Sequence, residues 1–211
     1  MSEIRKIGSV DLDGVAFKRW PGIQVGGLAA WAQPWSYNNP HMPTLVQSTF
    51  VRFADAGEAT LREDPVASTQ EKFFLWLHQQ RSVDRRVAEL LQRENFDLVV
   101  GNTGRPDKRA WVDMTMEGLA AGGFAGIFDG VYFKPKGASS EDTKYSTLYR
   151  MLHEGHVTHY DDNAQTVKRL APLLPEVDFV IVQDITSGIL FSAAEMRRNP
   201  NVTRIALKSF R

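Results

Sequence analysis

Short apolar runs alternate with helical patterns from about residue 96 to residue 210, and this alternation is the feature that most constrains the fold. Each run has the length of a buried strand and ends in polar or glycine-containing residues. The predicted strands span 4–10, 96–106, 126–135, 156–162, 177–184 and 202–210. Such alternation is typical of a Rossmann-like, doubly wound α/β fold, with a mainly parallel sheet and helices on both faces.

The segments between these runs carry apolar side chains at helical spacing. The predicted helices span 69–94, which holds either one long helix or two, 106–121, 141–154 and 163–174. Pro106 and Asp107 suit the first turn of the second of these segments. The glycine-rich stretch 118–126 precedes a strand instead of following one, so we expect it to end a helix rather than to bind a dinucleotide.

Residues 18–68 interrupt the alternation. They are too long for a plain connection between a strand and a helix, and they hold Trp20, Trp31, Trp35 and a stretch rich in proline and asparagine. We interpret them as a flap or small cap inserted after strand 1 of a single domain that spans 1–211. The tryptophans either form a small core of their own or line a substrate pocket.

Charge and composition exclude several classes of function. Lys+Arg and Asp+Glu both number 25, so no global basic field indicates nucleic-acid binding. The absence of cysteine excludes disulfides, thiolate nucleophiles and cysteine-based zinc sites. No secretory signal and no apolar run of membrane-spanning length is recognisable, so the expectation is a soluble, cytoplasmic protein without a membrane partner. The sequence does not indicate an oligomeric state.

Polar residues that bear reactive groups follow three of the predicted strands. They are Asp11 and Asp13 after the first, Asn102, Thr103, Gly104 and Arg105 after the second, and Asp161 and Asp162 after the fourth. Ligands of a doubly wound sheet bind at the carboxyl ends of its strands, so we expect these side chains to converge. Clustered carboxylates without histidine or cysteine favour a hard cation such as Mg²⁺.

The same residue types suit phosphoryl transfer. A carboxylate can attack phosphorus and form an acyl phosphate, and a second carboxylate can protonate the leaving oxygen. Asp11 and Asp13 are two residues apart, which places both on one side of an extended segment. The phosphoryl oxygens then need positive charge and hydrogen-bond donors, which Lys144 and Thr103 can supply.

The order of these motifs resembles that of the haloacid dehalogenase-like (HAD) phosphatases. The family's Asp-x-Asp motif is matched by Asp11-Leu-Asp13-Gly-Val, its second-motif threonine by Thr103, its lysine by Lys144, and its acidic pair by Asp161 and Asp162. The resemblance covers nearly all of the chain outside residues 18–68, where family members carry flaps or caps. One departure is Asn102, which precedes Thr103 where an apolar residue is more usual.

The resemblance implies a role for each matched residue. Asp11 would be the nucleophile of a phosphomonoester hydrolase, and Asp13 its acid and base. The implied phosphate-binding residues are Thr103, Gly104 and Lys144. The implied Mg²⁺ ligands are Asp11, Asp13 through its backbone carbonyl, Asp161 and Asp162. Asp162 is also expected to cap the helix that follows it.

A closer resemblance concerns the substrate. The segments NTGR, FKP, TKY and YDDN are similar to motifs of the RNA-repair "Swiss Army knife" type of HAD domain. This similarity implies a phosphate at a nucleic-acid end, and the basic residues Arg105, Lys108 and Arg109 favour it. The zero net charge favours a phosphorylated small molecule or a nucleotide instead.

Other interpretations of the same residues remain open. DLDG alone is typical of a turn, and TGRP of the start of a helix. Lys136 is an alternative to Lys144 as the phosphate-binding lysine. His159 is expected to be a buried structural histidine rather than a ligand. The alternative function is a catalytically inactive HAD-fold binding or scaffold domain that uses the tryptophan-rich insertion.

Overall fold

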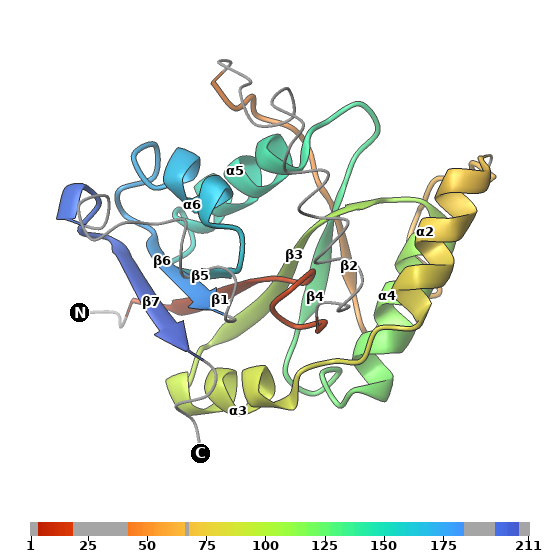
Figure 1. Ribbon diagram of the computed structural model, residues 1–211, viewed down its shortest axis with the longest axis horizontal. Helices are drawn as coiled ribbons and strands as arrows, with labels where there is room; N and C mark the ends of the chain where they lie inside the picture. The colour runs from red at the N-terminus through yellow and green to blue at the C-terminus, as the bar shows by residue number, and fades with distance from the viewer. Residues whose placement is uncertain (1–3, 19–41, 66–67, 184–196, 207–211) are drawn as a thin grey trace.

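The protein is built on one seven-stranded sheet (Figure 1). The computed structural model describes residues 4–18, 42–65, 68–183 and 197–206. The strands are β1 (Lys6–Asp11), β2 (Thr49–Arg52), β3 (Leu98–Pro106), β4 (Gly130–Lys134), β5 (His156–Asp161), β6 (Asp178–Gln183) and β7 (Val202–Ala206). Their order is β2-β4-β3-β1-β5-β6-β7, and every pair is parallel except β2 with β4. The predicted Rossmann-like α/β fold is confirmed.

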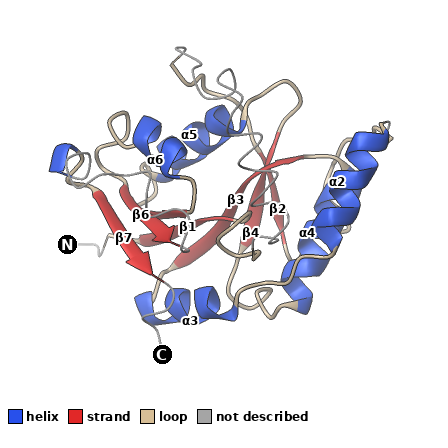
Figure 2. Cartoon of the chain, in the orientation of Figure 1, coloured by secondary structure: helices blue, strands red, loops and turns tan. Residues whose placement is uncertain are grey.

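Helices cover both faces of the sheet (Figure 2). They are α2 (Thr69–Gln79), α3 (Arg85–Glu94), α4 (Arg109–Ala121), α5 (Ser140–Met151) and α6 (Ala164–Leu170). One apolar core joins α3 and α4 to the face of the sheet that carries Val10 and Val99. The other joins α5 and α6 to the face that carries Ile7 and Val100. Among the described helices, none combines the length and the apolar character needed to cross a bilayer.

The helix boundaries decide one open alternative and correct one expectation. Residues 69–94 form two helices, because the chain turns before Asp84, whose side chain accepts a hydrogen bond from the backbone N–H of Arg86 and caps α3. The helix predicted from 106 begins only at Arg109. Pro106 still belongs to β3, which ends where predicted, and the N–H of Asp107 donates to the carbonyl of Lys134 on β4, so the helix begins three residues later than predicted. The glycine-rich stretch does end a helix, as predicted.

Part of the predicted insertion belongs to the sheet domain. β2 pairs with β4 at the edge of the sheet. The residues before it run along α5, where the N–H of Val46 donates to Ser146 Oγ at 2.7 Å and the hydroxyls of Ser48 and Thr147 lie 3.2 Å apart. Trp20, Trp31 and Trp35 lie outside the described residues, so a flap or cap stays a prediction.

Candidate active site

Four buried side chains meet where β1 and β5 end, and we call Asp11, Lys144, Asp161 and Asp162 the acidic cluster. Carboxylate oxygens of its three aspartates all lie within 4.8 Å of one another. Lys144 Nζ is 2.6 Å from Asp161 Oδ2 and 3.2 Å from Asp11 Oδ1. The predicted convergence of these four residues is thus observed.

The sheet register and helix α5 bring the cluster together. β1 lies between β3 and β5, and Val10 is paired with Tyr160, so the residues that follow each of them end neighbouring strands side by side. α5 begins with a capping box between Ser139 and Asp142. Lys144 lies on its inward face, one turn before the buried Leu148, and reaches the cluster from above the sheet.

Burial and like charge make this cluster electrostatically demanding. Burial raises the pKa of Asp11 well above its usual range; Lys144 lowers this pKa in part, whereas Asp161 and Asp162 raise it further. Burial alone would also raise the pKa of Asp161, but Lys144 and His159 hold it below the usual range. Burial alone would lower the pKa of Lys144, yet Asp11 and Asp161 raise it. Within the described residues, Lys144 is thus the ammonium group that both Asp11 and Asp161 contact, and Asp162 adds a third carboxylate to the cluster.

The donor set fits a hard divalent cation. Mg²⁺ binds oxygen ligands at about 2.0–2.1 Å, so two ligands on opposite sides of the ion lie about 4.2 Å apart. The oxygens of Asp11, Asp161 and Asp162 lie within 4.8 Å of one another, close enough to share one such ion. A divalent charge would also offset the repulsion among the three carboxylates.

Asp13 lies in different surroundings, which we call the arginine cluster: Asp13, His78, Arg81 and Arg105. Arg105 binds the Asp13 carboxylate through Nη2 at 2.7 Å and Nε at 3.1 Å, and Arg81 forms a second ion pair with it. Burial alone would raise the pKa of Asp13, but Arg105 and His78 outweigh it and hold that pKa well below the usual range.

This placement of Asp13 differs from the one that sequence spacing predicts. The strand ends at Asp11, and the chain turns at Gly14, whose φ is +97°. Alternation along an extended segment therefore no longer applies, and the two carboxylates face different groups. Among the described residues, the Asp13 carboxylate is not part of the group that could hold a metal. Coordination through its backbone carbonyl stays a prediction.

The TGR segment packs against the start of α5. The Thr103 hydroxyl is fully buried and accepts a hydrogen bond from the backbone N–H of Arg105 at 3.2 Å. A Cβ on Gly104 would lie 2.3 Å from Ser140 Oγ, so this position has room only for glycine. The contribution of Thr103 and Gly104 to phosphate binding stays a prediction.

The structure distinguishes the two candidate lysines. Lys144 is buried in the acidic cluster. Lys136 is exposed and lines a separate surface cavity of about 490 Å³, together with Thr44 and Asp142. Only Lys144, of these two, contacts the predicted nucleophile.

His159 is buried as expected, whereas Asp162 does not cap the helix that follows it. His159 is fully buried, with Nδ1 3.0 Å from Ser9 Oγ and Nε2 3.3 Å from Asp161 Oδ2, so it supports a carboxylate as a structural histidine does. Burial lowers the pKa of His159 although Asp161 opposes this shift. The capping prediction for Asp162 is wrong, because Asn163 caps α6 through its own side chain.

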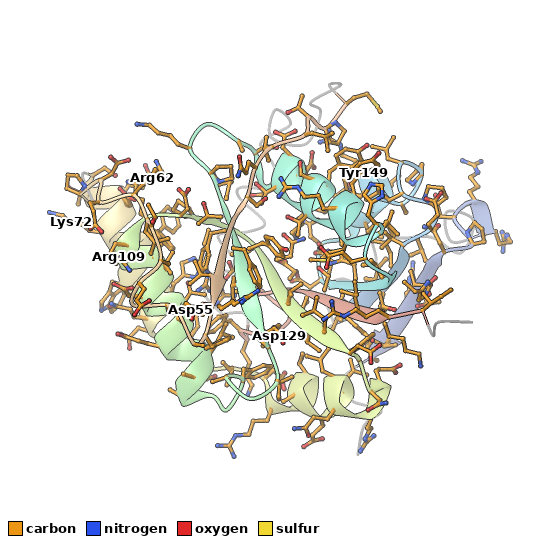
Figure 3. The ribbon with its side chains drawn as sticks, turned by 180° about the vertical axis from the view of Figure 1, so that it is seen from behind. Asp55, Arg62, Lys72, Arg109, Asp129 and Tyr149 are labelled. Atoms are coloured by element: carbon orange, nitrogen blue, oxygen red, sulfur yellow. The ribbon has the colours of Figure 1, made fainter. Side chains whose placement is uncertain are left out.

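The basic residues near the second motif are internally paired. Arg105 binds Asp13, and Lys108 Nζ lies 2.7 Å from Glu71 Oε1. Arg109, the first residue of α4 and labelled in Figure 3, donates to the carbonyls of two residues in the segment that follows β2. These contacts weaken the case for a free basic patch.

Sequence reasoning missed His78 and Arg81. Arg81 follows α2 and its side chain is only 6% exposed, although composition alone assigns a charged stretch that holds Arg81, Arg85 and Arg86 to the surface. Its partner Asp13 is 68 positions away, and no local pattern relates the two residues.

Comparisons with known proteins are sparse. No family model and no curated protein matches the chain. One solved structure with a similar course of the backbone is a haloacid dehalogenase-like family hydrolase from Streptococcus pneumoniae, at 14% identity and a TM-score of 0.48, over 98% of this chain and 95% of the other. A likeness of this extent assigns no activity, so the functional proposal below rests on the side chains of the site.

Proposed function

We propose that the chain is a HAD-type, Mg²⁺-dependent phosphomonoester hydrolase that works through an aspartyl-phosphate intermediate. The observation that carries the proposal is the acidic cluster, in which Lys144 lies between Asp11 and Asp161 at the carboxyl edge of a parallel sheet. The order of motifs along the chain supports it, since DLDG, TGR, a helical lysine and YDD all lie at this edge.

The proposed reaction has two steps, and Asp13 transfers a proton in each. In the first, a carboxylate oxygen of Asp11 bonds to phosphorus as the ester P–O bond breaks, and the leaving oxygen takes a proton from Asp13. In the second, water attacks phosphorus and gives a proton to Asp13, and the Asp11 carboxylate is released. Arg81 and Arg105 favour ionised Asp13, which suits the base step. The acid step requires these contacts to loosen.

The metal ligands would be the carboxylates of Asp11, Asp161 and Asp162, with the Asp13 carbonyl. A bound Mg²⁺ supplies positive charge to the phosphoryl oxygens and offsets the excess of carboxylates. Lys144 and the Thr103 hydroxyl would bind phosphoryl oxygens, and the burial of Lys144 keeps its charge near the reacting group.

A phosphorylated small molecule or a nucleotide is the favoured substrate class. The pairing of Lys108 with Glu71 and of Arg109 with nearby carbonyls leaves less free positive charge for a nucleic-acid backbone. Phosphate release from free nucleotides and sugar phosphates, compared with release from 3′- and 5′-phosphorylated oligonucleotides, separates the two classes.

The central test is hydrolysis of an aryl phosphate with Mg²⁺ and with EDTA. Lys144→Gln should abolish turnover, whereas the matched variant Lys136→Gln should keep it, because only Lys144 lies in the acidic cluster. Equal activity of both variants would contradict the assignment of Lys144. A wild-type protein that hydrolyses no member of a broad phosphate panel would favour a scaffold instead.

A further inference from the structure

Asn102 is a buried polar residue that none of the proposed roles uses. Its side chain is 0% exposed, and within the described part of the chain neither Oδ1 nor Nδ2 has a hydrogen-bond partner. A buried carboxamide without partners loses its hydrogen bonds to water and gains nothing in return. An apolar side chain would avoid this cost, so the amide requires an explanation.

The register of the sheet places Asn102 directly beside the proposed nucleophile. Asn102, in the middle of β3, is the partner of Asp11 on β1 and of Tyr132 on β4. Partners on neighbouring strands point to the same face of a sheet. This is the face under α5, because Val100, two residues before Asn102, belongs to the core that α5 covers. The amide and the Asp11 carboxylate are therefore neighbours across one strand spacing.

The two acidic side chains of this face are held unequally. Asp161 accepts hydrogen bonds from Lys144 and from the backbone N–H of Asn163, and it also contacts His159. Among the described residues, Asp11 has one ion-pair partner, Lys144, at 3.2 Å. Within the described residues, the Asp11 carboxylate, which has one ion-pair partner, thus lies next to the Asn102 amide, which has no hydrogen-bond partner.

We propose that Asn102 is a positioning residue that holds the Asp11 carboxylate during the reaction. Its Nδ2–H donates to one carboxylate oxygen and leaves the other free to attack phosphorus. Adjacent strands lie about 4.8 Å apart, so rotation of the two side chains is enough to bring the groups together. A neutral amide holds the nucleophile in place and leaves its negative charge intact, whereas a second lysine would neutralise that charge. This inference rests on the proposed function and extends it to a residue outside the motifs.

The test compares Asn102→Leu and Asn102→Ala with Val100→Ala, a control on the same strand and the same face. Both Asn102 variants remove the amide, but one side chain is larger and the other smaller. We expect kcat to fall about 10–100-fold in both, as for other supporting contacts around a reacting group, with KM nearly unchanged. We expect the ligand-free Tm of Asn102→Leu to rise by about 2–4 °C, since a buried orphaned group is removed. Val100→Ala should lose stability and keep kcat.

Two results would overturn the proposal. One is unchanged kcat in both Asn102 variants. The other is a loss of kcat in step with a loss of stability, which would make Asn102 merely structural. If the wild-type protein hydrolyses no phosphate ester, the proposed function fails, but the role of Asn102 can still be tested by ligand binding. The measurement is then the rise in Tm on addition of Mg²⁺ and beryllofluoride. A smaller rise in Asn102→Leu than in the wild type supports positioning, and equal responses, including none, overturn it.

Discussion

The two aspartates of the DLD motif are separated by one residue, yet their surroundings are opposite. Asp11 lies among carboxylates with one ammonium group, and burial raises its pKa. Asp13 lies between two guanidinium groups, and Arg105 and His78 hold its pKa low although burial opposes them. The difference arises because β1 ends at Asp11 and the turn at Gly14 redirects the chain. One strand end thus supplies a site short of positive charge beside a cluster with an excess of it.

Asp11→Asn is expected to have the largest effect on activity. The amide is a poor nucleophile, so turnover should fall by at least about 10³-fold. The ligand-free protein should lose no stability, because burial already disfavours the charged form of Asp11. Steady-state kinetics and denaturant unfolding measure the two effects. Full Mg²⁺-dependent turnover by this variant would refute the mechanism.

Lys144→Met should have the largest effect on stability. It leaves buried carboxylates without their counter-ion, at a cost of about 3–5 kcal/mol in EDTA at pH 7. The folded pKa of Asp161 is lowered and that of Lys144 is raised. The stability from this pair is therefore present between the unfolded-state values, about pH 4 to 10, and is lost as pH falls or rises beyond them.

Denaturant unfolding of Lys144→Met at pH 7 and pH 3 measures this effect. The difference from the wild type should shrink at pH 3, because without Lys144 the buried carboxylates take up protons there and no longer need a counter-ion. Lys136→Met is the control, because an exposed lysine should change the free energy of unfolding by no more than about 0.5 kcal/mol. Equal losses in the two variants would show that the acidic cluster does not depend on Lys144.

Asp13→Asn should cost stability, unlike Asp11→Asn. It leaves Arg81 and Arg105 without their carboxylate, at a cost of about 2–3 kcal/mol. Because the folded pKa of Asp13 is lowered, its contribution is present above the ordinary aspartate pKa and is lost in acid. Denaturant unfolding of the two variants at pH 7 measures this difference. An equal loss in the free energy of unfolding of both variants would contradict it.

Gly14→Ala tests the turn that separates the two clusters. The new Cβ would lie 1.9 Å from Asp162 Oδ2, in a backbone with φ of +97°. We expect a loss of about 2 kcal/mol and a weaker rise in Tm with Mg²⁺. Gly137→Ala is the matched control, since its φ is +82° and no atom lies within 4 Å of the new Cβ. Gly137→Ala therefore has the same backbone strain as Gly14→Ala but no steric clash of the new Cβ with a carboxylate. A similar Mg²⁺ response in both variants would show that Asp162 tolerates displacement.

Local sequence patterns predicted most of the fold and one of the two clusters. Apolar runs predicted the parallel strands, and their polar ends predicted that Asp11, Asp161 and Asp162 converge. Short strands were expected within 18–68, but the position and antiparallel pairing of β2 were not predicted, because its four residues carry no distinctive pattern and it is held by β4, about 80 residues later.

The arginine cluster could not be predicted for a related reason. Its members come from the end of β1, the end of α2 and the end of β3, and no periodic pattern joins them. A charged side chain in an exposed-looking run is assigned to the surface by composition alone. Arg81 is buried because the turn after Asp11 presents a carboxylate to it, which only the assembled fold specifies.

The central position of β1 has a consequence for how the protein is made. β1 is synthesised first, but its two neighbours, β3 and β5, begin about 90 and 150 residues later. Contacts between such distant segments form slowly, since long loops must close before any pairing is gained. A nascent chain that stops before β5 holds β1 with an unpaired edge and an incomplete acidic cluster. The proposed nucleophile is thus synthesised about 150 residues before the last strand that completes its surroundings, and it reaches its working environment only when β5 has paired.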